Sequence, residues 1–226
     1  AYRDTMIKRG FEGGITLYDV YDHSNYEQFK PMGDSLRDFR KDAVVSLCAV
    51  KGTDELQEEI ESALTDFHTD YIDLYRLYAV DDERVRIMER NRDAGNMRAI
   101  GVVSHDANQM MDYIDRYGDV LDYVMIIYNF HHNIGQFNNK GYPVNDYSAL
   151  IPRCERMGLG ILGIKPMGSD FMVELAEEKG FFKDPQASIA QAMLKYVYQN
   201  DAIHCTMPAM NSMEELAVNL ESAYSP

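Results

Sequence analysis

A repeated unit of helix, tight turn and buried strand constrains the fold of this chain more than any other feature. The clearest copy lies between residues 54 and 78. Its first half carries one apolar face at intervals of three and four residues, as a helix does: Leu56, Ile60, Ala63, Leu64 and Phe67. Its second half, 72–78, is short, rich in aromatic and aliphatic residues, and followed by a charged run. That pattern is typical of a strand that ends at the rim of a sheet.

The same unit recurs along the whole chain after a first helix at about 1–12. We predict strands at about 14–19, 44–50, 73–79, 99–103, 123–129, 160–166 and 202–208. We predict helices near 27–38, 54–67, 82–95, 106–116, 146–157, 186–199 and 212–222. Each helix returns the chain to the same edge of the sheet, so the strands run parallel. The sequence therefore predicts an α/β fold.

Composition limits the classes of protein to which the chain can belong. Its 226 residues, 46% of them hydrophobic, can bury one sizeable core, and we expect a single domain over residues 1–226. The net charge of −15, with no stripe of Lys or Arg, argues against a nucleic-acid partner. The three cysteines are Cys48, Cys154 and Cys205; they form no disulfide framework and favour a reducing, cytoplasmic location. No apolar run suits a membrane span, and no signal peptide is recognisable.

Three motifs resemble a known family in their order and spacing. They are Thr69–Tyr75, Met97–Val102 and the pair Tyr128-Asn129. Together they resemble the middle of the aldo-keto reductases, and the similarity extends from about Gly14 to Leu220. The resemblance implies a (β/α)8 TIM barrel that reduces small carbonyl substrates with NADPH or NADH. Because the sequence begins on a helix and offers seven strands, we expect the first strand of the barrel to be missing from this chain.

The resemblance also implies a catalytic group of four side chains. In the family, a tyrosine acts as the acid, a lysine lowers its affinity for the proton, an aspartate pairs with the lysine, and a histidine orients the carbonyl. Asp19 stands at the aspartate position, although an aspartate that caps the turn after a strand fits the pattern equally well. The tyrosine position is Ser24, which leaves Tyr26 as the substitute acid.

The other two catalytic positions also differ from the family pattern. The lysine position aligns with Ala49, and Lys51 follows two residues later. The histidine position is Tyr78, whose hydroxyl can still donate a hydrogen bond to a carbonyl. A tyrosine without a nearby ammonium group keeps a pKa of about 10, so we expect weakened acid catalysis at neutral pH. The candidate catalytic residues are thus Asp19, Tyr26, Lys51 and Tyr78.

The cofactor positions implied by the resemblance lie in the second half of the chain. They are Ser104, Asn129, Lys165, Asn211, Glu215 and Asn219. A helix that begins at Ser212 could receive a phosphate, but no Arg or Lys stands at the 2′-phosphate position. We therefore expect weak cofactor binding with little preference for the 2′-phosphate. The same residues are also consistent with barrel packing that is retained without a ligand.

Two further patterns bear on function. The glycines of Gly158–Gly163 have the spacing of a dinucleotide fingerprint, but they run into a strand rather than follow one, so we read them as a helix stop and a strand. Four histidines follow strand ends and suggest a rival metal site: His23, His105, His131 and His132. None has paired ligand spacing, and we assign no metal ligand.

Three functions remain open from the sequence. The first is a nicotinamide-dependent oxidoreductase whose catalytic tetrad is degenerate. The second is a binding or regulatory barrel that has lost catalysis and acts through a protein partner. The third is metal-assisted chemistry at the histidines. The sequence does not fix the substrate, and it leaves open both a homo-oligomer and a protein partner.

Overall fold

Seven parallel strands, joined through helices, make up the framework of the protein. The computed structural model describes residues 2–21, 28–130, 146–168, 174, 178, 180 and 188–224. The strands are β1 (Leu17–Tyr21), β2 (Val44–Ala49), β3 (Ile72–Leu77), β4 (Met97–Ser104), β5 (Tyr123–Ile127), β6 (Gly160–Ile164) and β7 (Cys205–Met207). They are hydrogen-bonded in chain order from β1 to β7, so the predicted alternation of strand and helix is confirmed.

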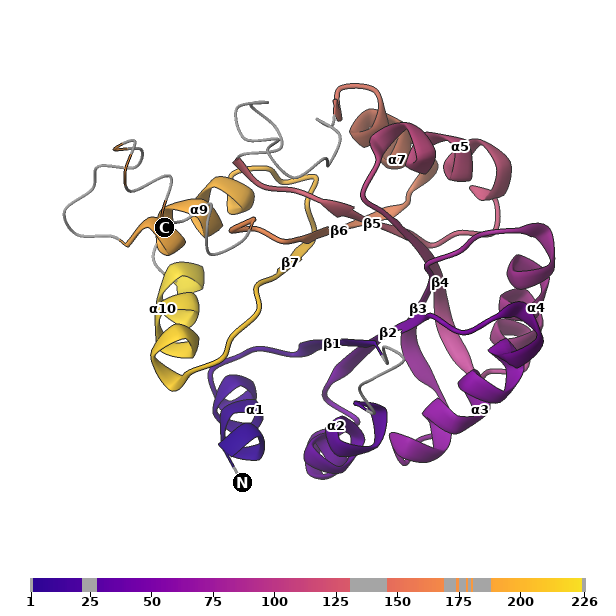
Figure 1. Cartoon of the computed structure of the whole chain (residues 1–226), viewed down its shortest axis with the longest axis horizontal. Helices are drawn as coiled ribbons and strands as arrows, with labels where there is room; N and C mark the ends of the chain where they lie inside the picture. Colours follow the sequence, from indigo (N-terminus) through magenta and orange to yellow (C-terminus); the bar gives the residue numbers. More distant parts are fainter. Residues whose placement is uncertain are drawn as a thin grey trace. The chain divides into compact units, whose positions relative to one another are not determined.

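The helices alternate with these strands (Figure 1). They are α1 (Tyr2–Glu12), α2 (Phe29–Leu36), α3 (Leu56–Asp66), α4 (Asp82–Asp93), α5 (Ala107–Tyr117), α7 (Leu150–Met157), α9 (Ile189–Tyr198) and α10 (Met213–Tyr224). None of the helices in the described part of the chain is long and apolar enough to cross a membrane. The glycine-rich stretch after α7 behaves as predicted, because Gly158 ends that helix with φ 71° and β6 follows.

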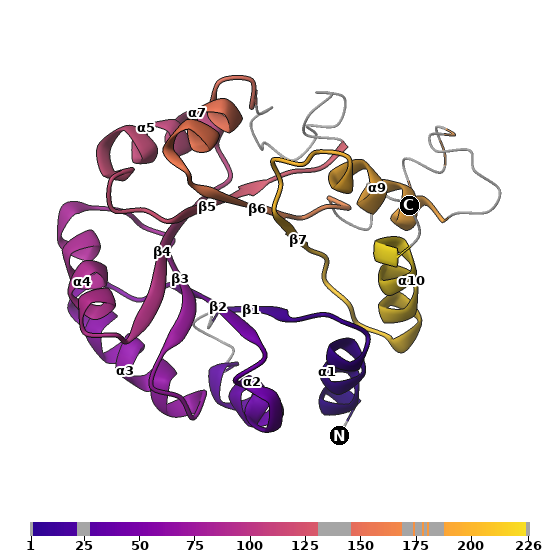
Figure 2. The same cartoon turned by 180° about the vertical axis from the view of Figure 1, so that it is seen from behind.

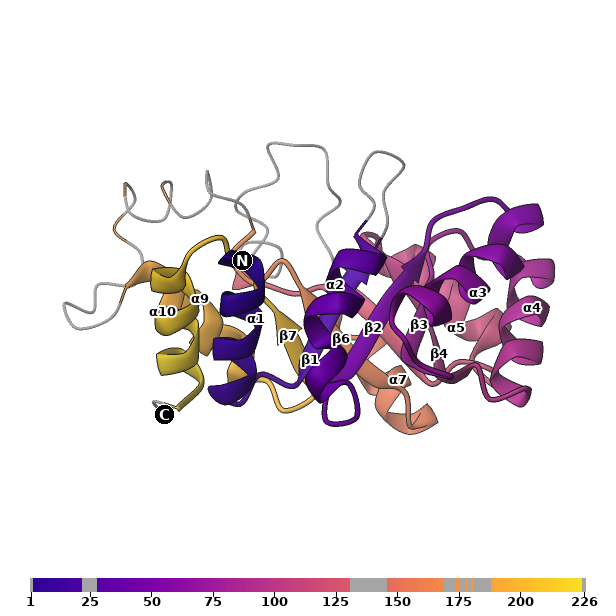
Figure 3. The same ribbon diagram turned by 90° about the horizontal axis from the view of Figure 1, so that it is seen from below.

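The chain divides into two compact units, which we describe one at a time. Unit 1 consists of Ala1–Val103 and Tyr113–Tyr123, and unit 2 consists of Ser104–Asp112 and Val124–Pro226. In unit 1, helices α2, α3 and α4 line one face of strands β1 to β4, as Figure 1 and the reverse view in Figure 2 show. In unit 2, α9 and α10 lie side by side (Figure 3).

The helix-facing side of the sheet in unit 1 is a core of buried apolar side chains. Leu56, Ile60 and Ala63 of α3 are fully buried, which confirms the apolar face expected for this helix. On β2, Val45, Leu47 and Ala49 are likewise fully buried. Because side chains alternate along a strand, the residues between them, Ser46 and Cys48, point to the opposite face. We call this opposite face of β1 to β4 the inner face.

Several boundaries differ from the sequence prediction by a few residues, and two of these differences have a clear local cause. The first strand begins at Leu17 rather than near residue 14, because the chain first turns through Gly14, which has a φ of 96°. Helix α3 begins at Leu56, since residues Thr53–Glu55 form a separate 3-10 turn. Both changes shift an element by a few residues and leave the order of elements intact.

Gly33 packs against backbone, and this leads to the first prediction. A Cβ at Gly33 would lie 2.1 Å from the carbonyl oxygen of Asp66, at the end of α3. We therefore expect Gly33→Ala to lower the free energy of unfolding by about 1–3 kcal/mol, because backbone atoms cannot yield as a flexible side chain can. Urea denaturation measures the effect. The control is Gly52→Ala, whose Cβ would meet nothing closer than 3.7 Å; an equal loss in both variants would contradict the prediction.

Candidate active site on the inner face of unit 1

Asp19 on β1 forms an ion pair with Arg76 on β3. Arg76 Nη1 lies 2.5 Å from Asp19 Oδ1, and Arg76 Nη2 donates to Asp19 Oδ2 at 3.0 Å. The contact is therefore bidentate, which is the strongest arrangement for a guanidinium and a carboxylate. The Arg76 side chain is 4% exposed and that of Asp19 17%. The pair thus lies almost entirely out of water.

Ser46 on β2 lies between the two strands and bonds to both charges. Its hydroxyl donates to Asp19 Oδ1 at 2.6 Å and accepts from Arg76 Nη1 at 3.0 Å. The register of the sheet explains the contact, because Asp19 is paired directly with Ser46 across β1 and β2. Three adjacent strands therefore hold one hydrogen-bonded polar cluster on the inner face: Asp19, Ser46 and Arg76.

Two further groups border this cluster. Cys48 is paired with Arg76 across β2 and β3, and burial raises the pKa of its thiol to about 11. Tyr123 begins β5, and its ring lies so close to Gly101 that a Cβ there would fall 2.3 Å from the ring. Burial raises the pKa of the Tyr123 hydroxyl well above its ordinary value. At neutral pH both groups are therefore protonated, and neither supplies a nucleophile.

The charge state of Arg76 depends on its partner. Burial alone would lower the pKa of this guanidinium, but the Asp19 carboxylate offsets that effect and the pKa is raised. Arg76 thus stays a cation inside the protein. Arg76 therefore places a positive charge beside Asp19, where the resemblance implies the charge of a lysine.

Sequence reasoning missed Arg76. The available signal was a long cationic side chain within Ile72–Leu77, a strand that is otherwise largely buried. A buried charge needs a partner, and Asp19 was already a candidate residue on a nearby strand. The pairing joins residues 57 positions apart in the sequence, so no local pattern identifies it.

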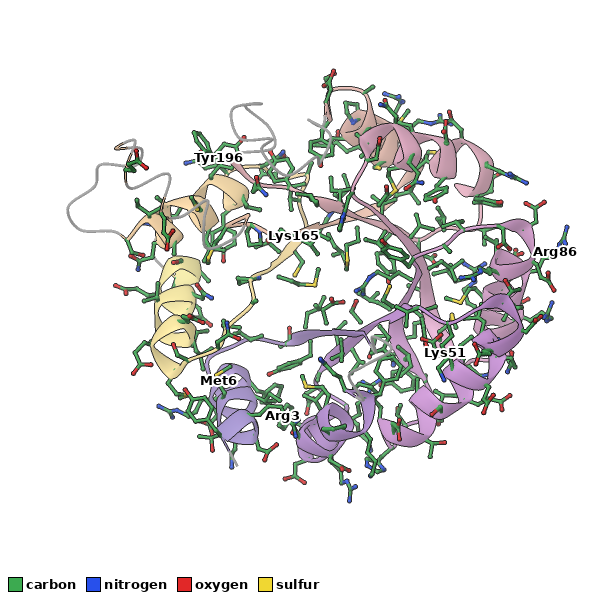
Figure 4. The ribbon with its side chains drawn as sticks, viewed as in Figure 1. Arg3, Met6, Lys51, Arg86, Lys165 and Tyr196 are labelled. Atoms are coloured by element: carbon green, nitrogen blue, oxygen red, sulfur yellow. The ribbon has the colours of Figure 1, made fainter. Side chains whose placement is uncertain are left out.

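The two neighbouring strand ends carry the other candidate catalytic residues of the described chain. The Lys51 side chain is exposed, just beyond β2, while its backbone N–H donates to Glu59 Oε2 at 3.1 Å (Figure 4). Tyr78 follows β3, and its backbone N–H donates to the Ala49 carbonyl at 3.4 Å. The Tyr78 side chain is 62% exposed. The structure therefore places these side chains in solvent and pairs the Asp19 carboxylate with Arg76.

Ala49 cannot hold the cation that the alignment placed there. It alternates with Ser46 and Cys48 and lies on the helix-facing side, fully buried. A lysine at this position would point away from Asp19, whereas one at Cys48 would point toward it. The predicted substitute acid, Tyr26, lies outside the described residues, as does Ser24.

The cofactor candidates all lie in unit 2. Ser104 ends β4, and the single proton of its hydroxyl has two acceptors in reach, the Asp106 carbonyl at 3.1 Å and Gln109 Oε1 at 2.7 Å. Asn129 follows β5, is fully buried, and donates its amide to the carbonyl of Lys165 at 2.8 Å. These two side chains therefore have structural partners of their own.

Lys165 is the one candidate cation in this set. It follows β6, is half-buried, and is labelled in Figure 4. Its φ of 53° is in the left-handed region, which few residues other than glycine adopt, and the amide of Asn129 holds its carbonyl. Backbone strain of this kind is often found at functional sites.

The start of α10 brings together the last three cofactor candidates. Ser212 Oγ accepts the N–H of Glu215 at 3.1 Å, so Ser212 caps the helix. Glu215 Oε2 accepts the N–H of Asn211 at 2.5 Å. Asn219, two turns from Ser212, is 6% exposed, and its Nδ2 has no hydrogen-bond partner among the described residues.

The rival metal site is only partly within the described chain. His105 is included, whereas His23, His131 and His132 lie outside the described residues. Within residues 2–21, 28–130 and the other described ranges, no three His, Cys, Asp or Glu side chains gather in a way that could hold a metal ion.

Comparison with known proteins decides the family. Residues 4–187 match the model of the aldo/keto reductase family. The chain belongs to this family. The Bacillus subtilis aldo-keto reductase YhdN is 29% identical over 123 residues, which cover 46% of this chain and 37% of YhdN. The chain thus matches little more than a third of that relative. The uncharacterised oxidoreductase YqkF of the same bacterium is 21% identical over 257 residues, covering 97% of this chain and 81% of YqkF.

Solved aldo-keto reductases share the fold. An aldo-keto reductase from Bacillus halodurans aligns with a TM-score of 0.77 and 17% identity, over 99% of this chain and 81% of its own. One from Klebsiella pneumoniae, solved with NADPH, aligns with a TM-score of 0.73 and 20% identity, over 97% and 78%. The predicted (β/α)8 fold class is thereby confirmed, with seven of its strands in the described residues.

Proposed function

We propose that this aldo-keto reductase is a nicotinamide-dependent oxidoreductase of small carbonyl compounds whose catalytic tetrad is degenerate. The family supports the reaction class, and the Klebsiella relative solved with NADPH supports the cofactor. The observation that carries the altered tetrad is the bidentate pair of Asp19 and Arg76. An arginine meets the carboxylate where the family pattern has a lysine, and the two cations are not equivalent.

A bound nicotinamide cofactor would supply a hydride to the carbonyl carbon, and residues of unit 2 are suited to hold it. The unpartnered Nδ2 of Asn219 is a buried donor that fits a ring nitrogen acceptor, as an adenine offers. Lys165 offers a cation at the carboxyl end of a parallel strand, the edge at which barrel enzymes bind ligands. These residues therefore fit a nicotinamide dinucleotide.

Proton supply is the altered part of the proposed reaction. A guanidinium has a pKa too high to give up a proton, and Arg76 is already bound at both outer nitrogens by Asp19. Arg76 therefore neutralises Asp19 without acting as the acid. The carbonyl oxygen would receive its proton from a tyrosine, either Tyr26 or Tyr78 at the end of β3, with Lys51 as the remaining cation near β2.

Calorimetric titration with NADH and NADPH tests the proposal. We expect saturable binding of at least one of them, with micromolar or weaker affinity, because charged contacts to a 2′-phosphate are absent from α10. Submicromolar affinity for NADPH at physiological salt would contradict this part of the proposal. Failure of both cofactors to bind at millimolar concentration would favour the alternative of a binding or regulatory barrel.

A further inference from the structure

We propose that the cofactor site of this protein takes NADH in preference to NADPH. The inference rests on the proposed function and adds the identity of the cofactor. Its basis is the first turn of α10 and the segment that leads into it. The two cofactors differ only in the 2′-phosphate of the adenosine ribose. The preference therefore depends on whether the protein has groups that can bind the doubly charged 2′-phosphate.

Two of the backbone donors around this helix start are already engaged. The N–H of Glu215 donates to Ser212 Oγ at 3.1 Å, and the N–H of Asn211 donates to Glu215 Oε2 at 2.5 Å. A helix N-terminus binds anions through free N–H groups of this kind. Here the side chains of Ser212 and Glu215, the second of them an anion, occupy two of these donors.

The charges in the sequence around this turn are all negative. Glu214 and Glu215 occupy the first turn of α10, and both are exposed. No Lys, Arg or His occurs between Cys205 and Tyr224, so neither β7 nor the whole of α10 carries a cation. A 2′-phosphate brought to this turn would meet carboxylates, and like charges brought together weaken binding.

Asn219 independently indicates that a ligand belongs beside this turn. Its side chain is more than nine-tenths buried, and its Nδ2 lacks a partner within the described chain. A helical side chain leans toward the N-terminal end of its helix, so this amide extends toward the turn that holds Glu215. A buried donor without a partner is costly, and a bound acceptor would satisfy it.

The same carboxylates suit the ribose of NADH. An unmodified 2′-hydroxyl is a hydrogen-bond donor, and an acidic side chain accepts it in many NAD sites, whereas an arginine accommodates the 2′-phosphate in NADP sites. Glu215 already accepts the N–H of Asn211, which leaves Glu214 as the other carboxylate of the first turn. Its exposed position in the first turn makes it the residue whose charge should decide between the cofactors.

Competitive calorimetry on the full chain, with NADH and NADPH as the probes, tests the inference. We expect the wild-type dissociation constant for NADH to be at least about tenfold lower than that for NADPH. Glu214→Arg should narrow or reverse that ratio by about tenfold, chiefly by tightening NADPH. The matched control is Glu221→Arg, which makes the same change of charge nearer the end of the same exposed helix surface.

The possible results of this titration separate the inference on cofactor preference from the proposed function. Equal or tighter binding of NADPH by the wild-type protein would overturn the inference and leave the proposed function standing. A similar gain for NADPH in both arginine variants would also overturn it, because net charge rather than the first turn would then set the preference. Failure of both dinucleotides to bind would overturn the proposed function together with the inference.

Discussion

Replacing Arg76 with methionine is expected to lower the free energy of unfolding by about 3–5 kcal/mol, the cost of leaving one partner of a buried ion pair behind. The substitution removes both bonds to Asp19 and the bond that Arg76 donates to Ser46. Asp19 would then lie on the inner face as an uncompensated carboxylate, with its hydrogen bond from Ser46 as the remaining support. Urea denaturation followed by circular dichroism measures the loss.

A second substitution separates the ion pair from the loss of a large side chain. The double variant Asp19→Asn with Arg76→Met removes both charges, and we expect it to recover a substantial part of the stability that Arg76→Met loses. This recovery is expected because the cost comes from the stranded charge rather than from the missing pair. A loss below about 1 kcal/mol in the single variant would show that water reaches Asp19.

Aldehyde reduction is expected to be at least about a thousandfold slower than in an aldo-keto reductase with the tyrosine and lysine in place, since general acid catalysis contributes roughly 10²–10⁴. The reason is that Arg76 occupies the carboxylate of Asp19 and cannot donate a proton. Turnover is measured with a simple aldehyde at saturating concentration, from the change in absorbance as the reduced cofactor is oxidised.

Restoring the tetrad gives a matched pair of variants. Ser24→Tyr with Cys48→Lys and Arg76→Met should raise turnover, because Cys48 lies on the face of Asp19. Ser24→Tyr with Ala49→Lys and Arg76→Met should not, because Ala49 faces the helices.

Turnover of several per second in the unmodified protein would contradict the account. Tyr26→Phe and Tyr78→Phe would then identify the acid.

Local patterns predicted the fold well. The apolar face of α3 repeats every three or four residues, and such a repeat reports burial without knowledge of the partner strand. The helix start expected at Ser212 also depends on neighbours in sequence, and Ser212 caps α10 by accepting the N–H of Glu215. The order of strands followed from the alternation of helix and strand, which allows few other topologies.

The candidate site was less predictable because it depends on which face each strand residue occupies. A shift of one residue moves a side chain to the other face, and the aligned lysine position at Ala49 is such a case. Cys48, its neighbour, is the residue that shares the inner face with Arg76. The pairing of Asp19 with Arg76 required the register of three strands, which no single motif encodes.

Transfer of a deuteride from cofactor to substrate tests most directly the central claim that this barrel reduces carbonyl compounds with an altered acid group. The protein is incubated with a simple aldehyde and NADH that carries deuterium at the transferred position, and the alcohol is analysed by mass spectrometry. We predict an alcohol with one deuterium on the former carbonyl carbon, formed slowly and only when the protein is present. If calorimetry shows bound cofactor but the labelled alcohol does not exceed the protein-free control, the claim of catalysis is wrong and the protein is a nucleotide-binding barrel.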